Sequence, residues 1–77
     1  MKLPVVSGNE AVSVFRKAGY EFDIQHGSHM ILRHSSPPYR RLSIPNHKEL
    51  AKGTLRALIR DAGLTVEEFA RLLWRKS

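Results

Sequence analysis

Apolar and polar residues alternate along this chain with a period that changes from helical to extended and back to helical. The first segment carries apolar residues at helical spacing, namely Ala11, Val12, Phe15 and Ala18. This spacing predicts a helix over about residues 8–18. Ser7 and Glu10 are placed to form a capping box at its start, and Gly19 is placed to stop it.

Three strands are predicted after Gly19. The first covers Tyr20–Gln25, with Tyr20, Phe22 and Ile24 expected to face the core. His26-Gly27-Ser28 is expected to form a turn, and the second strand covers His29–His34. Ser35-Ser36-Pro37-Pro38 ends that strand, because neither proline can donate a hydrogen bond to a sheet.

The third strand is predicted over Tyr39–Ile44, with Leu42 and Ile44 on one face and Arg41 and Ser43 on the other. Three strands joined by short connections favour an antiparallel meander. The helical period then returns in a stripe made of Leu55, Leu58, Ile59 and Ala62, and Gly63 is placed to end this helix. A second capping box, Thr65 to Glu68, begins the last helix, whose apolar residues are Val66, Phe69, Ala70, Leu72 and Leu73. The sequence therefore predicts a single α+β domain over residues 1–77, with element order α-β-β-β-α-α.

Composition narrows the class of protein. The chain has 77 residues and no cysteine, which excludes disulfides and thiolate metal sites. Its 13 Lys and Arg outnumber its 7 Asp and Glu, which gives a formal net charge of +6. Such an excess favours nucleic acid as a partner. No apolar run reaches the roughly 20 residues of a membrane-spanning helix, and no signal peptide is recognised, so we expect a cytoplasmic protein without membrane contact.

The basic residues fall mainly in the middle of the chain and beyond. Arg33 and Arg41 are expected to point outward, because Leu32 and Leu42 point inward. Binding of phosphates is one interpretation of these side chains, and ordinary solubility of exposed faces is the other. Phosphate contacts would carry no sequence specificity.

Among the histidines His26, His29, His34 and His47, we consider His29 as a candidate for proton transfer. It follows Gly27-Ser28 at the start of a strand, where the turn leaves the backbone open to a phosphate. A histidine there is able to take the proton of an RNA 2′-hydroxyl, with cations stabilising the charge on the phosphoryl oxygens. A structural or surface role for His29 stays open from the local sequence alone.

Two other chemistries fit the histidines less well. A zinc site needs three or four converging ligands, and His29 and His34 are expected on opposite faces of one strand. Nucleophilic catalysis by Ser28 needs an oriented base, but the side chains of adjacent residues diverge in an extended chain. The sequence therefore predicts neither a metal site nor a cofactor. His47 and Lys48, just before the second helix, are placed either to hold a phosphate or merely to pack or cap.

Five segments, in order, resemble the HicA family, the toxins of HicA–HicB toxin–antitoxin systems. They are residues 3–8, 27–34, 44–50, 52–56 and 62–65, and the Gly27-Ser28-His29 motif lies within the second. The loop at 35–39 departs from the simpler, glycine-containing hairpin of many relatives. The resemblance implies a fold like a double-stranded RNA-binding domain, with helices on one face of a three-stranded sheet.

The resemblance also implies an activity and a partner. It implies an mRNA interferase, an endoribonuclease that cleaves mRNA and arrests growth, with His29 as its catalytic histidine and a HicB-like antitoxin covering the active surface. The residues expected to contact RNA are Gly27, Ser28, Arg33, Arg41, His47, Lys48 and Lys52. Two alternatives stay open: a module that binds double-stranded RNA without cutting it, and a chain whose main role is antitoxin pairing.

Overall fold

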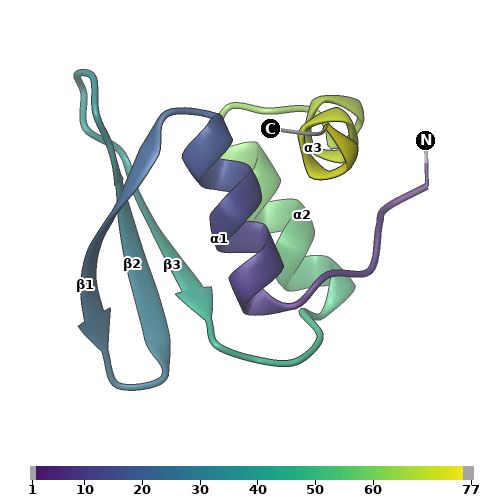
Figure 1. Ribbon diagram of the computed structural model, residues 1–77, viewed down its shortest axis with the longest axis horizontal. Coiled ribbons are helices and arrows are strands. Elements are labelled where there is room, and N and C mark those ends of the chain that lie inside the picture. The colour runs from purple at the N-terminus through teal and green to yellow at the C-terminus, as the bar shows by residue number, and fades with distance from the viewer. Residues whose placement is uncertain (1, 76–77) are drawn as a thin grey trace.

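One three-stranded antiparallel sheet lies on one side of the molecule and the helices lie on the other (Figure 1). This computed structural model describes residues 2–75. The elements are α1 (Gly8–Lys17), β1 (Tyr20–His26), β2 (His29–His34), β3 (Arg41–Pro45), α2 (Lys52–Asp61) and α3 (Val66–Trp74). The α+β class and the predicted order α-β-β-β-α-α are confirmed.

The sheet has the order β1-β2-β3, so β2 is its central strand. Met30 and Leu32 of β2 pair with Ile44 and Leu42 of β3, and all four side chains are buried beneath the helices. The alternate positions Arg33 and Arg41 face the other way, as their spacing predicts. We call this second side of the sheet the outer face.

The prediction that Phe22 and Ile24 point into the core is wrong. Phe22 is 48% exposed and Ile24 is 55% exposed, and only Tyr20 of β1 is buried. The pairing of β1 with β2 shifts between Phe22 and Ile24, which marks a β-bulge. Because the bulge inserts one extra residue, Ile24 pairs with Ile31 on the outer face instead of continuing the buried row.

The third strand is shorter than predicted, because it begins at Arg41 and not at Tyr39. Tyr39 has a φ of 58°, which is left-handed backbone that cannot continue a strand. The first strand is longer than predicted and includes His26, so the connection to β2 is the two-residue turn Gly27-Ser28. Gly27 has a φ of 60°, as the first central residue of a type II′ hairpin turn requires.

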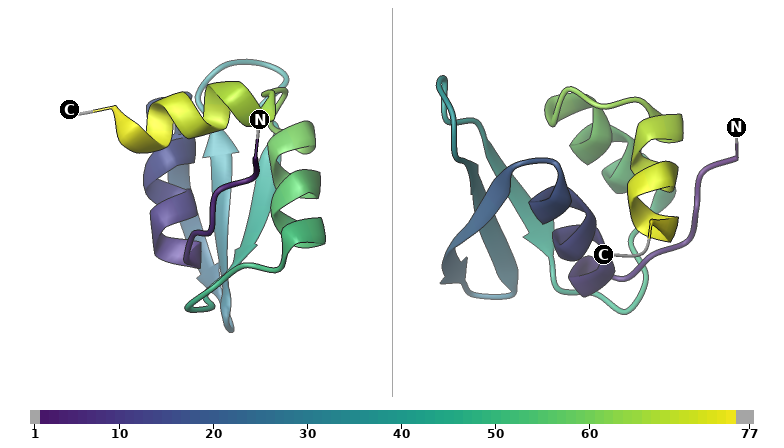
Figure 2. Two further views of the ribbon diagram at one scale, coloured as in Figure 1. Left: turned by 90° about the vertical axis from the view of Figure 1, so that its right-hand side faces the viewer. Right: turned by 45° about the horizontal axis from the view of Figure 1, so that its top comes forward.

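The helices form two layers above the sheet. α1 and α2 run side by side against the strands, and α3 crosses them on the side away from the sheet (Figure 2). The ring of Phe15 on α1 lies 5.3 Å from that of Phe69 on α3, and both side chains are fully buried. These contacts make the aromatic centre of the core and fix α3 on α1.

Both predicted capping boxes are present. Ser7 Oγ accepts a hydrogen bond from the Glu10 amide at 3.0 Å, and the Ser7 amide donates to Glu10 Oε1 at 2.9 Å. Thr65 and Glu68 make the same pair of bonds at the start of α3. At the other end of α3, Lys17 Nζ donates to the carbonyl of Leu72, which satisfies one of the last carbonyls of the helix.

No helix within residues 2–75 has both the length and the apolar character needed to cross a membrane.

Candidate nucleic-acid interface

The outer face of the sheet brings together side chains from all three strands. Cross-strand partners on an antiparallel sheet share a face, so the register assigns the members of this surface. Its polar members are Glu21, His26, His29, Arg33, Arg41 and Ser43. Helices cover the opposite side of the same strands (Figure 1). The outer face is therefore the broad surface of the sheet that stays open to a partner.

His29 is the first residue of β2 and is exposed on this outer face. The sequence predicted this place for it, at the start of a strand just after the turn. An exposed imidazole beside a tight turn is accessible to a ligand, which any proton transfer by this side chain would require.

His26 lies directly opposite His29, a neighbour that the sequence interpretation missed. The two residues are Cα partners across the Gly27-Ser28 turn, and both are exposed. Directly opposed residues have Cβ atoms about 4.5–5.5 Å apart. The signal was in the sequence, because a two-residue turn always pairs the residues that flank it. The structure thus supplies two adjacent imidazoles where the sequence interpretation used one.

The turn itself is held by the segment that follows β3. The Asn46 amide donates a hydrogen bond to the Ser28 carbonyl at 2.8 Å, and the Gly8 amide donates to the His47 carbonyl at 2.8 Å. Gly27 has open space around its Cα, since an added Cβ would meet nothing within 4 Å. This end of the sheet is therefore a fixed frame with an open, glycine-containing tip.

Arg33 and Arg41 are Cα partners on β2 and β3. The Arg41 guanidinium lies 3.9 Å from the Asp23 carboxylate, and both side chains are well exposed, so this ion pair contributes little to stability. The strand register puts both arginines on the same surface as His29, as the sequence predicted.

His47, Lys48 and Lys52 lie apart from that surface, between β3 and α2 and at the first turn of α2. All three are exposed. The contact found for His47 is made by its backbone carbonyl, which accepts from Gly8. The N-cap of α2, Ala51, makes no side-chain capping bond. A role for these three residues in RNA binding stays a prediction.

His34 has a structural environment and faces the helices. Its ring packs edge-on against Tyr20, with ring centres 4.8 Å apart. Its Nδ1 accepts a hydrogen bond from the Ser36 amide at 3.0 Å, which orders the start of the loop at 35–40. His34 and His29 therefore lie on opposite faces of β2, as the sequence predicted.

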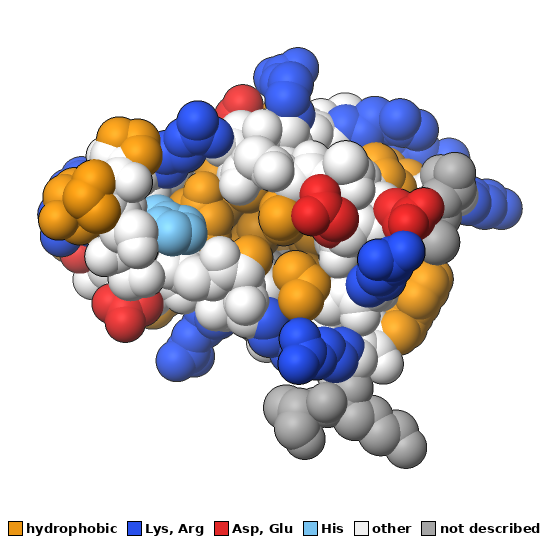
Figure 3. Space-filling model, turned by 90° about the horizontal axis from the view of Figure 1, so that it is seen from above, with side chains coloured by type: hydrophobic (Ala, Val, Ile, Leu, Met, Phe, Trp, Pro, Cys, Tyr) orange, Lys and Arg blue, Asp and Glu red, His pale blue; other side chains and the backbone are white. Residues whose placement is uncertain are grey.

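Two further features of the described residues bear on where a functional site lies. Within residues 2–75, no three His, Cys, Asp or Glu side chains are grouped as metal ligands would be. Positive charge alone also fails to locate a site, because Lys and Arg side chains lie in several separate places on the face shown in Figure 3. The histidine pair and the two arginines of the outer face locate the candidate interface better than the net charge does.

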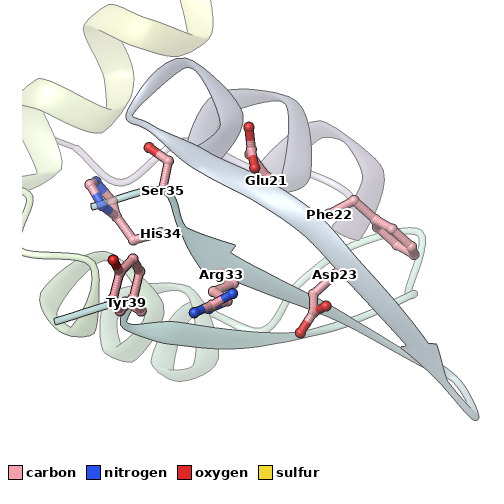
Figure 4. Close-up of a pocket in the computed structure, with 7 residues that line it drawn as sticks. All are labelled: Glu21, Phe22, Asp23, Arg33, His34, Ser35 and Tyr39. Carbon is pink, nitrogen blue, oxygen red and sulfur yellow. The ribbon is translucent and has the colours of Figure 1, made fainter. Parts of the chain in front are cut away.

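A shallow pocket opens next to Arg33, beyond the part of the surface that holds the histidines. It has a volume of about 190 Å³ and is lined by Glu21, Phe22, Asp23, Arg33, His34, Ser35 and Tyr39. Arg33 lies between Tyr39 and Asp23, whereas the ring of Phe22 points away from them (Figure 4). The sequence interpretation did not single out Tyr39, because it assigned this residue to a strand.

Taken together, these features define a small basic α+β protein with an exposed histidine pair and two arginines on the open face of its sheet. The sequence model of the family described as the HicA toxin of bacterial toxin–antitoxin systems matches residues 8–64. This match covers most of the 77 residues, and the chain belongs to the HicA toxin family. A search of curated proteins found no match to the chain.

Proposed function

We propose that this toxin is an endoribonuclease that cleaves mRNA at the outer face of its sheet, with His29 as the proton-transfer group. The observation that carries the proposal is the position of His29, exposed at the start of β2 on the same face as Arg33 and Arg41. An imidazole gains and loses a proton near neutral pH. A guanidinium group is able to donate two parallel hydrogen bonds to the oxygens of one phosphate. Cleavage of RNA by attack of its own 2′-hydroxyl uses both a proton-transfer group and a cation that binds the phosphate.

The reaction consistent with these groups uses the 2′-hydroxyl of RNA as nucleophile. A neutral imidazole removes the 2′-proton while the 2′-oxygen attacks phosphorus, and the bond from phosphorus to the 5′-oxygen breaks. The leaving 5′-oxygen takes up a proton. The products are a 2′,3′-cyclic phosphate and a 5′-hydroxyl. The arginines stabilise the charge that develops on the phosphoryl oxygens.

The pair His26 and His29 matches the two proton transfers of this reaction. One group must accept the 2′-proton and a second must donate a proton to the 5′-oxygen, because a single side chain cannot do both in one step. The two residues are cross-strand partners on one face, which supports a role for both at the same phosphate. We assign His29 the essential transfer and His26 the complementary one.

The toxin–antitoxin context of the family supports a proposal for the partner and the compartment. A HicB-like antitoxin is the expected inhibitor, and covering the outer face is the simplest way for it to block RNA. A toxin whose substrate is mRNA is expected in the cytoplasm.

The test is to incubate the chain and its His29→Ala variant with a defined RNA and to map the ends produced. General acid–base catalysis contributes about 10²–10⁴-fold, so His29→Ala should lose at least about a hundredfold in cleavage rate. The variant should keep its circular dichroism spectrum and its binding to the antitoxin. An RNA with a 2′-deoxy sugar at the scissile nucleotide should resist the unmodified chain.

Two results would reject the proposal. Cleavage of the 2′-deoxy substrate would exclude attack by the ribose hydroxyl. Full activity of His29→Ala would remove the histidine from the chemistry and would favour the alternative of a binding module that does not cut.

A further inference from the structure

Tyr39 and Arg33 form a stacked pair at the edge of the outer face. The guanidinium carbon of Arg33 lies 4.6 Å from the centre of the Tyr39 ring. Tyr39 is 45% exposed. Its backbone has a φ of 58°, a region that a bulky side chain seldom occupies. The loop therefore holds an exposed aromatic ring in place against an arginine.

Arg33 has no competing ion pair among residues 2–75. The ion pairs of the described chain belong to Arg41, Arg60 and Arg71. Arg33 is close enough to the Tyr39 ring for a cation–π interaction. Guanidinium planes and aromatic rings are both groups on which nucleobases stack. The Arg33 guanidinium contacts the Tyr39 ring but no carboxylate among the described residues, so it is available to a ligand.

The pocket beside this pair has the size and the polarity for one planar group. Its volume of about 190 Å³ is below the roughly 300–1,000 Å³ of sites for drug-sized ligands. Glu21 and Asp23 lie along it on β1, with Arg33 between Asp23 and Tyr39 (Figure 4). Carboxylates accept hydrogen bonds from the exocyclic amines of adenine, cytosine and guanine, and uracil has no such amine.

We propose that this pocket binds one unpaired nucleobase with an exocyclic amine, stacked on the Arg33–Tyr39 pair. The inference rests on the proposed function, because it takes the outer face as the path of the RNA. Arg33 follows His29 by four positions on β2, which is about 13 Å at strand spacing. The pocket therefore reads a base that flanks the scissile phosphate, and it provides sequence preference that the arginines alone cannot supply.

The test measures RNA binding to the full chain carrying His29→Ala, so that cleavage does not interfere. The probes are a short oligouridylate and the same oligomer with one adenosine. The adenosine should tighten binding about five- to a hundredfold, which is the range for one well-placed polar contact that discriminates between bases. Adding Tyr39→Asn should abolish this preference, because asparagine tolerates the left-handed backbone and removes the ring. Tyr39→Phe should restore it.

Trp74→Ala supplies the matched control, since Trp74 is an exposed aromatic residue on α3, away from the sheet. It should leave the preference for adenosine intact. Equal binding of both oligomers, or an unchanged preference in Tyr39→Asn, would overturn the base pocket. A Tyr39→Asn variant that loses only antitoxin affinity would also overturn it and would assign the pocket to the antitoxin.

These outcomes are separable from those of the cleavage test. A chain that cuts RNA without preferring adenosine would reject the base pocket and leave the nuclease standing. A chain that prefers adenosine but leaves every RNA intact would reject the nuclease and leave the base pocket standing.

Discussion

At the scale of single residues, two positions are determined by atoms from distant parts of the chain. Gly8 begins α1 and lies against the end of β3, where an added Cβ would collide with the carbonyl oxygen of Pro45. Tyr20 is only 2% exposed and packs between Phe15 and His34. Neither constraint is visible in the neighbouring sequence, and each has a measurable consequence.

Gly8→Ala should lower the free energy of unfolding by about 1–3 kcal/mol, the cost of overpacking a rigid site. The atoms it would meet belong to the backbone of Pro45 and Asn46, so no side chain can move aside. Urea denaturation measures the change. Gly53→Ala is the control, because Gly53 lies in α2 with nothing within 4 Å of an added Cβ. That variant should gain about 0.5–1 kcal/mol, and equal effects of the two substitutions would refute the argument.

Burial raises the pKa of the Tyr20 hydroxyl above its usual value of about 10, and Asp61 adds to the rise while Arg40 opposes it. The unfolded chain therefore ionises this group first as pH increases. Tyr20 contributes stability that is complete below about pH 10 and is lost as pH rises through the folded pKa. Denaturation followed from pH 8 to 11 should show a flatter decline for Tyr20→Phe than for the unmodified chain. Parallel declines would contradict the assignment.

At the scale of the elements, local sequence determines the helices better than the strands. α1 and α3 begin at capping boxes that involve residues only three positions apart. The strand β1 is different, because its pairing partners and its bulge belong to the sheet as a whole. The alternation of Tyr20, Phe22 and Ile24 that indicates a strand led to a wrong prediction of burial for two of the three. Phe22 is exposed although it pairs with buried Leu32, and the bulge turns Ile24 to the outer face.

Ser7→Ala should destabilise the protein by about 1 kcal/mol, because the Glu10 amide loses its acceptor at the start of α1. Thermal denaturation checks this. Ser13 supplies the control from the same helix, since its hydroxyl only donates back to the Asn9 carbonyl. Ser13→Ala should be neutral or slightly stabilising, and a loss as large as that of Ser7→Ala would show that the cap is not the cause.

At the scale of the whole molecule, the sheet separates a buried side from an open one. The helices cover one face, and α3 lies outside α1 and α2 (Figure 1). The outer face carries His26, His29, Arg33 and Arg41. A positively charged protein that binds RNA through phosphates releases counterions, so its affinity must fall as salt increases.

The salt dependence of RNA binding should identify the outer face as the surface that meets the RNA. For single strands the slope of log K against log salt changes by about 0.7 for each phosphate that the protein no longer neutralises. Arg41→Ala, measured in the His29→Ala chain, should reduce the slope by about that amount. Arg71→Ala is the control, because Arg71 lies on α3 and is paired with Glu67 at 2.6 Å. Equal slopes for the two variants would place the RNA elsewhere.

The sequence by itself determined the order of elements, both capping boxes, the inward rows of β2 and β3, the basic character and the position of His29 after its turn. These features depend on residues a few positions apart, whose periodicity and hydrogen bonds are local. The tertiary structure decided which way Ile24 faces, where α3 packs, why Gly8 must be small and how Tyr39 meets Arg33. Those features depend on strand pairing and on contacts between distant segments, which no local pattern encodes.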